Sequence, residues 1–224
     1  MGQFKEFFTE RRSIANAVAE EIYRELQNTP RLSRASVYDV TSRLMQDYDG
    51  DRLGSGAFAN VYGGQNGGYV VKIAINDNVA RSFFSNMHKY ENPLFPKIEK
   101  HLILEHSDEL VVDIYVLERL KVDFDGDESA NMQFLKKVSE ATGANYNCFT
   151  LIDVVGLLKK GVLSEDKIAA FDNVMRQYGR TVEQLIDFVA TIRKTTNAIS
   201  LDVHCENFGF NTEGGLVIFD PVSF

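Results

Sequence analysis

The sequence predicts an α+β protein in which a β-rich first part is followed by a helical second part. Three observations support this class. The chain has 224 residues, of which 44% are apolar and 25% charged, as is typical of a globular protein with enough apolar material for a core. Glycines punctuate short apolar stretches between residues 52 and 75, as they do in strands joined by turns. From residue 129 onward, apolar residues recur mainly at helical spacing.

Two helices are expected ahead of the strands. Residues 4–27 follow the i, i+3, i+4, i+7 rhythm of one apolar helix face, formed by Phe4, Phe7, Phe8, Ile14, Val18, Ile22 and Leu26. Pro30 ends this helix, and Ser36 followed by Asp39 resembles a capping box that opens a short second helix. Because an isolated helix is marginal without tertiary packing, we expect the first helix to bury its apolar face against the body of the protein.

The remaining elements follow in chain order. A strand, a glycine turn and a second strand are expected from residue 52 to residue 75, further strands at about 97–104 and 110–118, and short ones at 208–210 and 216–219. Helices are expected at 76–90, 131–141, 149–160, 164–178 and from 181 onward. We therefore divide the chain into a helical extension (1–46), a β-rich lobe (47–120) and a helical lobe (121–224).

Charge and cysteine content narrow the classes of function. The chain has 24 Lys plus Arg against 32 Asp plus Glu, a net charge of −8 that argues against nucleic acid as a partner. No apolar run approaches the roughly 20 residues of a membrane helix, so no membrane partner is expected, and the charged N-terminus lacks a secretory signal pattern. Cys148 and Cys205 lie far apart in no C-x-x-C arrangement, so we expect neither a zinc site nor a disulfide framework, as fits a reducing cytoplasm.

The first candidate site is a glycine-rich turn between two strands. Its backbone N–H groups could approach phosphate oxygens, and it comprises Gly54, Ser55, Gly56, Ala57, Phe58 and Val61. The glycines of a plain hairpin would look much the same. Lys72 favours the phosphate interpretation, because a lysine inside the apolar strand 69–75 either faces solvent or needs an anion.

The second candidate site is formed by Asp202, Asn207 and Asp220. Asn207 stands five residues after Asp202, and Asp220 follows thirteen residues later, after a hydrophobic strand. These oxygen ligands on short connectors are suited to hold Mg²⁺ on a triphosphate and to orient an attacking hydroxyl.

In this order the motifs resemble those of the protein kinase superfamily, over about residues 51–224. The matching segments are the glycine-rich loop at 54–61, the strand-three lysine motif at 70–72, the hinge at 116–120, the catalytic loop at 202–207 and the D-F-G aspartate at Asp220. The D-x-H-x-x-N pattern of the catalytic loop and the pentapeptide 220–224 are similar to those of the early serine/threonine kinases of T7-like bacteriophages.

The resemblance implies a two-lobed, protein-kinase-like fold with a β-rich N-lobe, a reduced helical C-lobe and an N-terminal helical extension. It implies ATP and Mg²⁺ as cofactors and host proteins as Ser/Thr substrates, phosphorylated in the host bacterial cytoplasm early in infection. The resemblance implies that the glycine-rich turn and Lys72 contact the phosphates and that Glu118 and Leu120 offer backbone groups to adenine. It implies that Asp202 orients the substrate hydroxyl and that His204 faces the γ-phosphate. Asn207 and Asp220 are implied to bind the metal.

The sequence departs from the family pattern at several points. Ala59 replaces the third loop glycine, and the expected helix at 76–90 offers no convincing Glu to pair with Lys72, for which Asp77 is a poor substitute. The sequence stops four residues after Asp220, so we expect either that the helices of 131–199 and the N-terminal pair supply a reduced substrate surface or that catalysis on proteins has been lost. Two alternatives stay open. One is a kinase-fold binding protein that inhibits a host defence or transcription factor, and the other is a small-molecule kinase, which His204 suggests.

Overall fold

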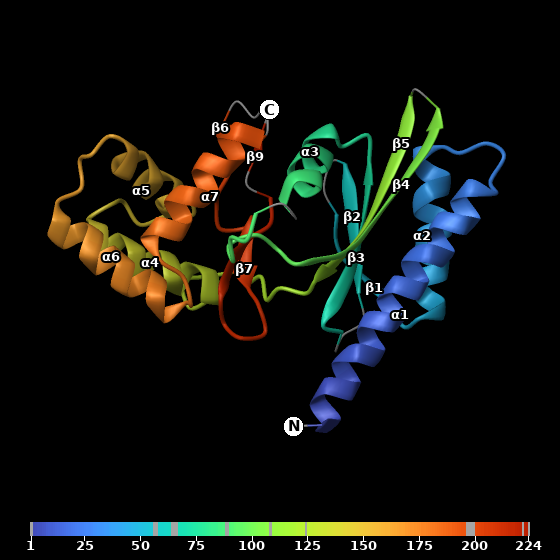
Figure 1. Cartoon of the computed structure of the whole chain (residues 1–224), viewed down its shortest axis with the longest axis horizontal. Coiled ribbons are helices and arrows are strands. Elements are labelled where there is room, and N and C mark those ends of the chain that lie inside the picture. Colours follow the sequence, from blue (N-terminus) through green and yellow to red (C-terminus); the bar gives the residue numbers. More distant parts are fainter. Residues whose placement is uncertain are drawn as a thin grey trace. The chain divides into compact units, whose positions relative to one another are not determined.

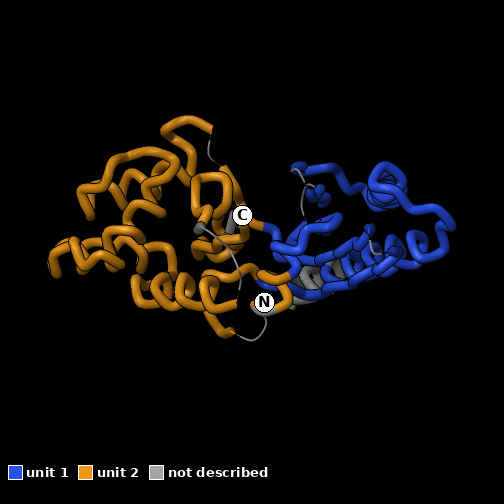
Figure 2. The backbone as a smooth tube through the Cα atoms, turned by 90° about the horizontal axis from the view of Figure 1, so that it is seen from above, with its two compact units in different colours: residues 1–81, 97–119 blue, residues 82–96, 120–224 orange. Residues whose placement is uncertain are grey.

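The computed structural model of the protein describes residues 2–55, 58–63, 67–87, 90–107, 109–123, 125–195, 200–220 and 222–223 (Figure 1). For residues 2–11, 13, 86, 200, 222 and 223 it gives secondary structure without side chains. The chain forms two compact units, which Figure 2 distinguishes by colour. The first unit consists of Met1–Arg81 and Lys97–Arg119, and the second of Ser82–Pro96 and Leu120–Phe224. One of the boundaries falls within helix α3 (Asn78–Met87).

The first unit is built on a five-stranded antiparallel sheet with the order β1-β2-β3-β5-β4. Its strands are β1 (Asp51–Ser55), β2 (Ala59–Gly63), β3 (Tyr69–Ile75), β4 (Ile98–Ser107) and β5 (Leu110–Glu118). The predicted strands at 69–75, 97–104 and 110–118 are confirmed, and two strands, β1 and β2, precede them where one was expected. β3 occupies the centre of the sheet, as its almost continuous run of apolar residues predicts.

The strand register divides the side chains of the sheet between two faces. Val61 of β2 pairs with Lys72 of β3, which in turn pairs with Tyr115 of β5. Directly paired residues share a face, so these three side chains lie together. Val71 and Ile73 alternate with Lys72 along β3 and therefore belong to the opposite face.

Helices α1 (Gly2–Gln27) and α2 (Arg34–Asp47) cover the face that carries Val71 and Ile73 (Figure 1). The expected burial of α1 is confirmed for Val18, Ile22 and Leu26, which pack into the core formed with the sheet. Ile14 is exposed, and the side chains of Phe4, Phe7 and Phe8 lie outside the described residues. These two helices do not cover the opposite face of the sheet, which carries Lys72.

The start of α2 corrects one detail of the sequence analysis. Ser33 is the N-cap, and its side chain accepts a hydrogen bond of 3.2 Å from the Ser36 amide. The Ser36 hydroxyl in turn accepts one of 2.8 Å from the Ser33 amide. The predicted box of Ser36 with Asp39 is therefore wrong, because Ser36 fills the third position of a box that begins three residues earlier.

Among its described residues, the second unit combines the second half of α3 and four further helices with two small sheets. The helices are α4 (Ala130–Thr142), α5 (Thr150–Lys159), α6 (Glu165–Gln177) and α7 (Val182–Thr195). A hairpin joins β7 (Phe208–Phe210) to β8 (Leu216–Ile218), and β6 (Ser200–Leu201) pairs with β9 (Val222–Ser223). The β6–β9 pair was not predicted, because a strand of two residues is too short to show alternation.

The core of the second unit is rich in phenylalanine. Phe134, Phe171, Phe188 and Phe208 are fully buried, and the Phe134 ring meets that of Phe208 edge to face at 5.6 Å. This packing fixes α4 against the hairpin. Among the described residues, no helix has the length and apolar character needed to span a membrane.

A buried ion pair ties the start of α3 to the sheet within the first unit. The Asp113 side chain is fully buried, and Arg81 donates to its two oxygens through Nε at 3.0–3.1 Å and through Nη2 at 2.7 Å. Nε2 of His101 lies 2.9 Å from the same carboxylate. Burial raises the pKa of Asp113, but the hydrogen bonds from His101 and Arg81 outweigh this effect, so the pKa is lowered overall.

We expect Asp113→Asn to destabilise the protein by about 3–5 kcal/mol, because it leaves the Arg81 charge without its anion in a site that is largely buried. Chemical unfolding near neutral pH measures this loss. Glu20→Gln removes an exposed carboxylate that pairs with Lys100 and serves as the matched control, with no measurable change expected. Equal stability of Asp113→Asn and Glu20→Gln would contradict the role given to this ion pair.

The same ion pair predicts a pH dependence. Since the pKa of Asp113 lies below its ordinary value of 3.8, its contribution is fully present above that value and is lost as the pH falls through the lowered pKa. The difference in unfolding free energy between wild type and Asp113→Asn should therefore be constant near neutral pH and shrink in acid. A difference that stays constant into strong acid would refute this assignment.

Candidate functional site

The β7–β8 hairpin brings two of the predicted site residues together. Phe208 pairs with Ile218, so the residues just before β7 and just after β8 must lie side by side. The Asn207 carbonyl accepts hydrogen bonds from the amides of Phe219 at 3.0 Å and Asp220 at 3.5 Å. Thirteen residues of separation in the sequence thereby become direct backbone contact between Asn207 and Asp220.

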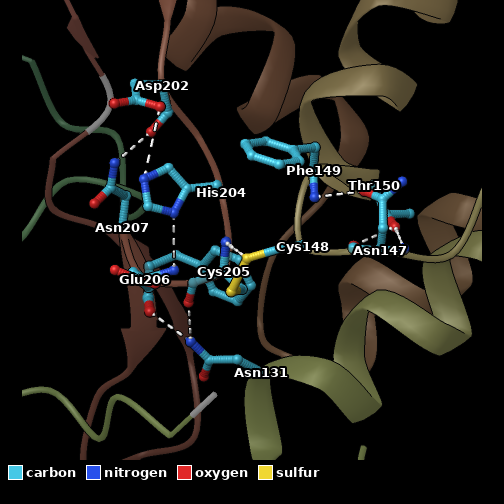
Figure 3. Close-up of a disulfide and its surroundings, with 11 residues drawn as sticks. Asn131, Asn147, Cys148, Phe149, Thr150, Asp202, His204, Cys205, Glu206 and Asn207 are labelled. Carbon is cyan, nitrogen blue, oxygen red and sulfur yellow. Dashed lines mark hydrogen bonds and ion pairs between the residues drawn. A yellow bond between two sulfur atoms is a disulfide. The ribbon is translucent and has the colours of Figure 1, made fainter. Parts of the chain in front are cut away.

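The loop before β7 adds Asp202 and His204 to the same place (Figure 3). Nδ2 of Asn207 donates to the Asp202 carbonyl at 2.6 Å, and the Asn207 amide donates to the His204 carbonyl at 3.0 Å. Nε2 of His204 lies 3.7 Å from Oδ1 of Asp202. The structure therefore places Asp202, His204, Asn207 and Asp220 in one short region of the second unit.

Asn131 braces this loop, and the sequence analysis missed it. It lies in the first turn of α4, is fully buried, and donates through Nδ2 to the carbonyls of Cys205 at 2.6 Å and Phe208 at 2.8 Å. A signal was present in the sequence. Asn131 occupies the apolar stripe that Phe134, Leu135 and Val138 continue, and a polar residue in such a stripe needs buried partners.

A disulfide joins Cys148 to Cys205 and corrects the expectation for the two cysteines. Their Cα atoms are 4.8 Å apart, and the Cys205 amide donates to the Cys148 carbonyl at 3.0 Å (Figure 3). The expectation is wrong because 57 residues of separation say nothing about distance in the fold. The disulfide links the candidate loop to the turn that precedes α5.

The glycine-rich turn belongs to the first unit and is described in part. Gly54 and Ser55 are exposed residues of β1, whereas Gly56 and Ala57 lie outside the described residues. A Cβ built on Gly54 meets no atom within 4 Å, so no protein neighbour explains the glycine. Phe58 is 52% exposed, with the Arg34 guanidinium 5.9 Å from its ring centre.

Lys72 is 8% exposed and lies on the sheet face opposite α1 and α2, beside Val61. As expected, α3 supplies no acidic residue, and Asp77 instead caps this helix by accepting a 2.9 Å hydrogen bond from the Ala80 amide. Asp113 shares the face of Lys72 and stands diagonally across β3 and β5 from it.

In the segment 116–120, both the backbone and the side chain of Glu118 are hydrogen-bonded within the first unit. The Glu118 amide donates to the Lys97 carbonyl at 3.0 Å, and the Glu118 carboxylate accepts from the Lys97 amide at 2.9 Å. The Glu118 N–H is thus occupied by the protein itself and is not free to bind adenine. Leu120 is partly buried and begins the long segment of the second unit.

A cavity of about 660 Å³ lies elsewhere in the first unit, between the two N-terminal helices and the sheet. Its lining includes Val18, Met45, Tyr62 and Val71 and contains none of the site residues predicted from the sequence. It therefore belongs to the covered face of the sheet and not to the face of Lys72.

Comparisons with known proteins find similarity among solved structures only. No family profile and no curated protein matches the chain by sequence. Among solved structures, the chain is similar to the crystal structure of Rad53 1–466 in complex with AMP-PNP, with a TM-score of 0.36 and 16% identity. The match covers 82% of this chain and 42% of that one. A TM-score of 0.36 does not establish a shared fold.

Proposed function

We propose that the protein is an ATP-dependent phosphotransferase with a protein-kinase-like fold that transfers the γ-phosphoryl group to Ser or Thr hydroxyls of proteins. The observation that carries this proposal is the convergence of Asp202, Asn207 and Asp220 at the open end of the β7–β8 hairpin. Motif spacing selected these residues, and the backbone contacts supply a physical reason for that spacing.

The donor set at this place fits a magnesium ion. Nδ2 of Asn207 is committed to the Asp202 carbonyl, which leaves Oδ1 as the side-chain acceptor, and Asp220 is exposed. Amide and carboxylate oxygens are the hard ligands that Mg²⁺ prefers. Asn207 and Asp220 would hold the ion, which when bound neutralises charge on the phosphates of ATP.

The other residues would act by positioning and charge, which supply most of the catalysis in phosphoryl transfer. Asp202 would accept a hydrogen bond from the substrate hydroxyl and orient it, with His204 beside it facing the γ-phosphate. In the first unit, the exposed Gly54 offers room for close approach of phosphates to the backbone. Lys72, which is buried on the sheet face opposite α1 and α2, would bind the α and β phosphates.

Host proteins early in phage infection are the proposed substrates, on the strength of the sequence resemblance. The pentapeptide 220–224 carries that resemblance, and Pro221 and Phe224 lie outside the described residues. The decisive experiment incubates the purified protein with γ-labelled ATP, Mg²⁺ and a bacterial lysate. Labelled Ser or Thr in proteins supports the proposal. A labelled small metabolite supports a small-molecule kinase, and the absence of any label supports a binding protein.

We expect Asp220→Ala to lower Mg²⁺-dependent transfer at least about 100-fold, because it removes a charged ligand from the site of developing charge. Initial rates with a labelled protein substrate measure the effect. Glu213→Gln removes a charge from the exposed turn at the far end of the same hairpin and is the matched control. Wild-type activity of Asp220→Ala, with an unchanged melting temperature, would refute the metal-binding role.

Lys72→Met should weaken ATP binding and turnover more than Lys72→Arg. Methionine removes the cation, whereas arginine keeps the charge but presents it in a wider, planar group. Calorimetric titration with ATP and Mg²⁺ measures binding, and Lys136→Met, at an exposed position of α4, controls for the loss of a lysine. If wild type binds no ATP at millimolar Mg²⁺, the nucleotide assignment fails and the binding-protein alternative is favoured.

A further inference from the structure

We propose that Cys148, Cys205 and His204 form a zinc-binding site once the disulfide is reduced. The ligand atoms of these three residues, two sulfurs and a ring nitrogen, all lie within 4.8 Å of one another. His204 and Cys148 are partly buried and Cys205 is buried, so a cation would be shielded while solvent still reaches the site. This site is distinct from the proposed Mg²⁺ ligands, and its existence does not depend on phosphoryl transfer.

The two cysteines stay close without the bond between their sulfurs. The Cys205 amide donates to the Cys148 carbonyl at 3.0 Å, and the Cys205 carbonyl accepts a 2.6 Å hydrogen bond from the buried Asn131. Neither contact involves the sulfur–sulfur bond. Reduction therefore leaves both Cβ atoms in place, and rotation of the side chains can open the sulfurs to the roughly 3.8 Å that two thiolates span in a tetrahedral zinc site.

The turn that carries Cys148 is also held independently. The Thr150 hydroxyl donates to the carbonyls of Asn145 at 2.8 Å and Asn147 at 2.7 Å, and it accepts from the Asn147 amide at 2.8 Å. Oδ1 of Asn147 accepts from the Phe149 amide at 2.7 Å (Figure 3). A ligand on such a turn loses little conformational entropy when it binds metal.

One backbone contact favours the thiolate form that metal binding needs. The Cys205 amide lies 3.2 Å from Sγ of Cys148 and donates toward it. An N–H group directed at sulfur stabilises negative charge there, as it does for other anions. The structure thus already contains a hydrogen-bond donor for a metal-bound Cys148 thiolate.

His204 is oriented for ligation by its neighbours. Its Nδ1 accepts a long hydrogen bond of 3.3 Å from the Glu206 amide, which shows that this nitrogen is the unprotonated one, and a metal ion would replace that amide at its single lone pair. Its Nε2 faces Asp202 at 3.7 Å. Histidines that bind metal commonly direct the second ring nitrogen at a carboxylate, so the arrangement assigns Nδ1 as the ligand and Nε2–H as the group facing Asp202.

Two thiolates and one imidazole select zinc among the common divalent cations, because zinc combines nitrogen and sulfur ligands at tetrahedral geometry. Three protein ligands leave the fourth position to water. A dithiol reductant gives two electrons and two protons to the disulfide, yields two cysteine thiols and becomes a disulfide itself. Zn²⁺ then replaces the two thiol protons, which pass to solvent. The disulfide and the zinc site are therefore mutually exclusive states of the same residues.

The test uses the full chain, reduced with a dithiol and freed of it by gel filtration without oxygen. Titration with Co²⁺ should give one equivalent of tetrahedral ligand-field absorption with thiolate charge-transfer bands, and added Zn²⁺ should remove both. The oxidised protein should give neither. Cys148→Ser and Cys205→Ser should abolish the charge-transfer bands of a two-thiolate site, and His204→Ala should weaken binding at least about 10-fold.

His106→Ala is the matched control, since it removes an exposed histidine outside the cluster and should leave cobalt binding unchanged. The His204→Ala variant keeps both cysteines, and its circular dichroism checks that the fold persists. Absence of thiolate absorption in the reduced wild type would overturn the proposal, as would equal cobalt affinity of His204→Ala and wild type. Because the readout is metal binding alone, failure here would leave the proposed phosphotransferase activity untouched.

Discussion

The antiparallel pairing of β7 with β8 is the constraint on which the candidate site depends. A hairpin brings the residues that flank its two strands together, whatever the length of its turn, and here it places Asn207 against Asp220. The pairing alone would leave the preceding loop free to vary. Asn131, in the first turn of α4, limits that freedom, because its buried side chain donates to the carbonyls of Cys205 in the loop and Phe208 at the start of β7.

In the first unit, sheet register performs the equivalent task. Alternation along β3 sends Val71 and Ile73 into the core beneath α1 and α2 and leaves Lys72 on the other face. Lys72 and Asp113 are buried charged residues on the same face, and a buried charge needs hydrogen bonds or an opposite charge. Arg81 and His101 provide these for the Asp113 carboxylate. In this ion pair the helix α3 supplies the cation, Arg81, and the strand β5 supplies the anion, Asp113. A pair between a strand lysine and a helix glutamate would have the opposite arrangement of charges.

Much of the fold could be predicted because its elements are long and periodic. The apolar stripe of α1 buries one helix face, and the almost continuous apolar run of β5 matches a strand that is buried on both faces. The residue that caps a helix is harder to predict, because several serines near a helix start can each serve as the N-cap. In α2 the N-cap is Ser33 and not Ser36. In the candidate site, the proximity of Asp202 and Asn207 could be predicted from the sequence, since both residues lie on one short loop. The spatial relation of Asn131 to that loop depends on packing between distant segments.

Cys205 shows why a motif alone gives an incomplete account of a site. It occupies a position between Asp202 and Asn207 at which the motif accepts any residue, so the pattern assigns it no role. Yet the amide and carbonyl of Cys205 bind Cys148 and Asn131, and its sulfur joins the disulfide. The side chain of Asn207 also holds the loop, since its Nδ2 donates to the Asp202 carbonyl, so motif residues and the residues between them share the anchoring. The attachment of this loop to the rest of the protein thus rests on Cys205 as well as on the motif residues Asp202 and Asn207.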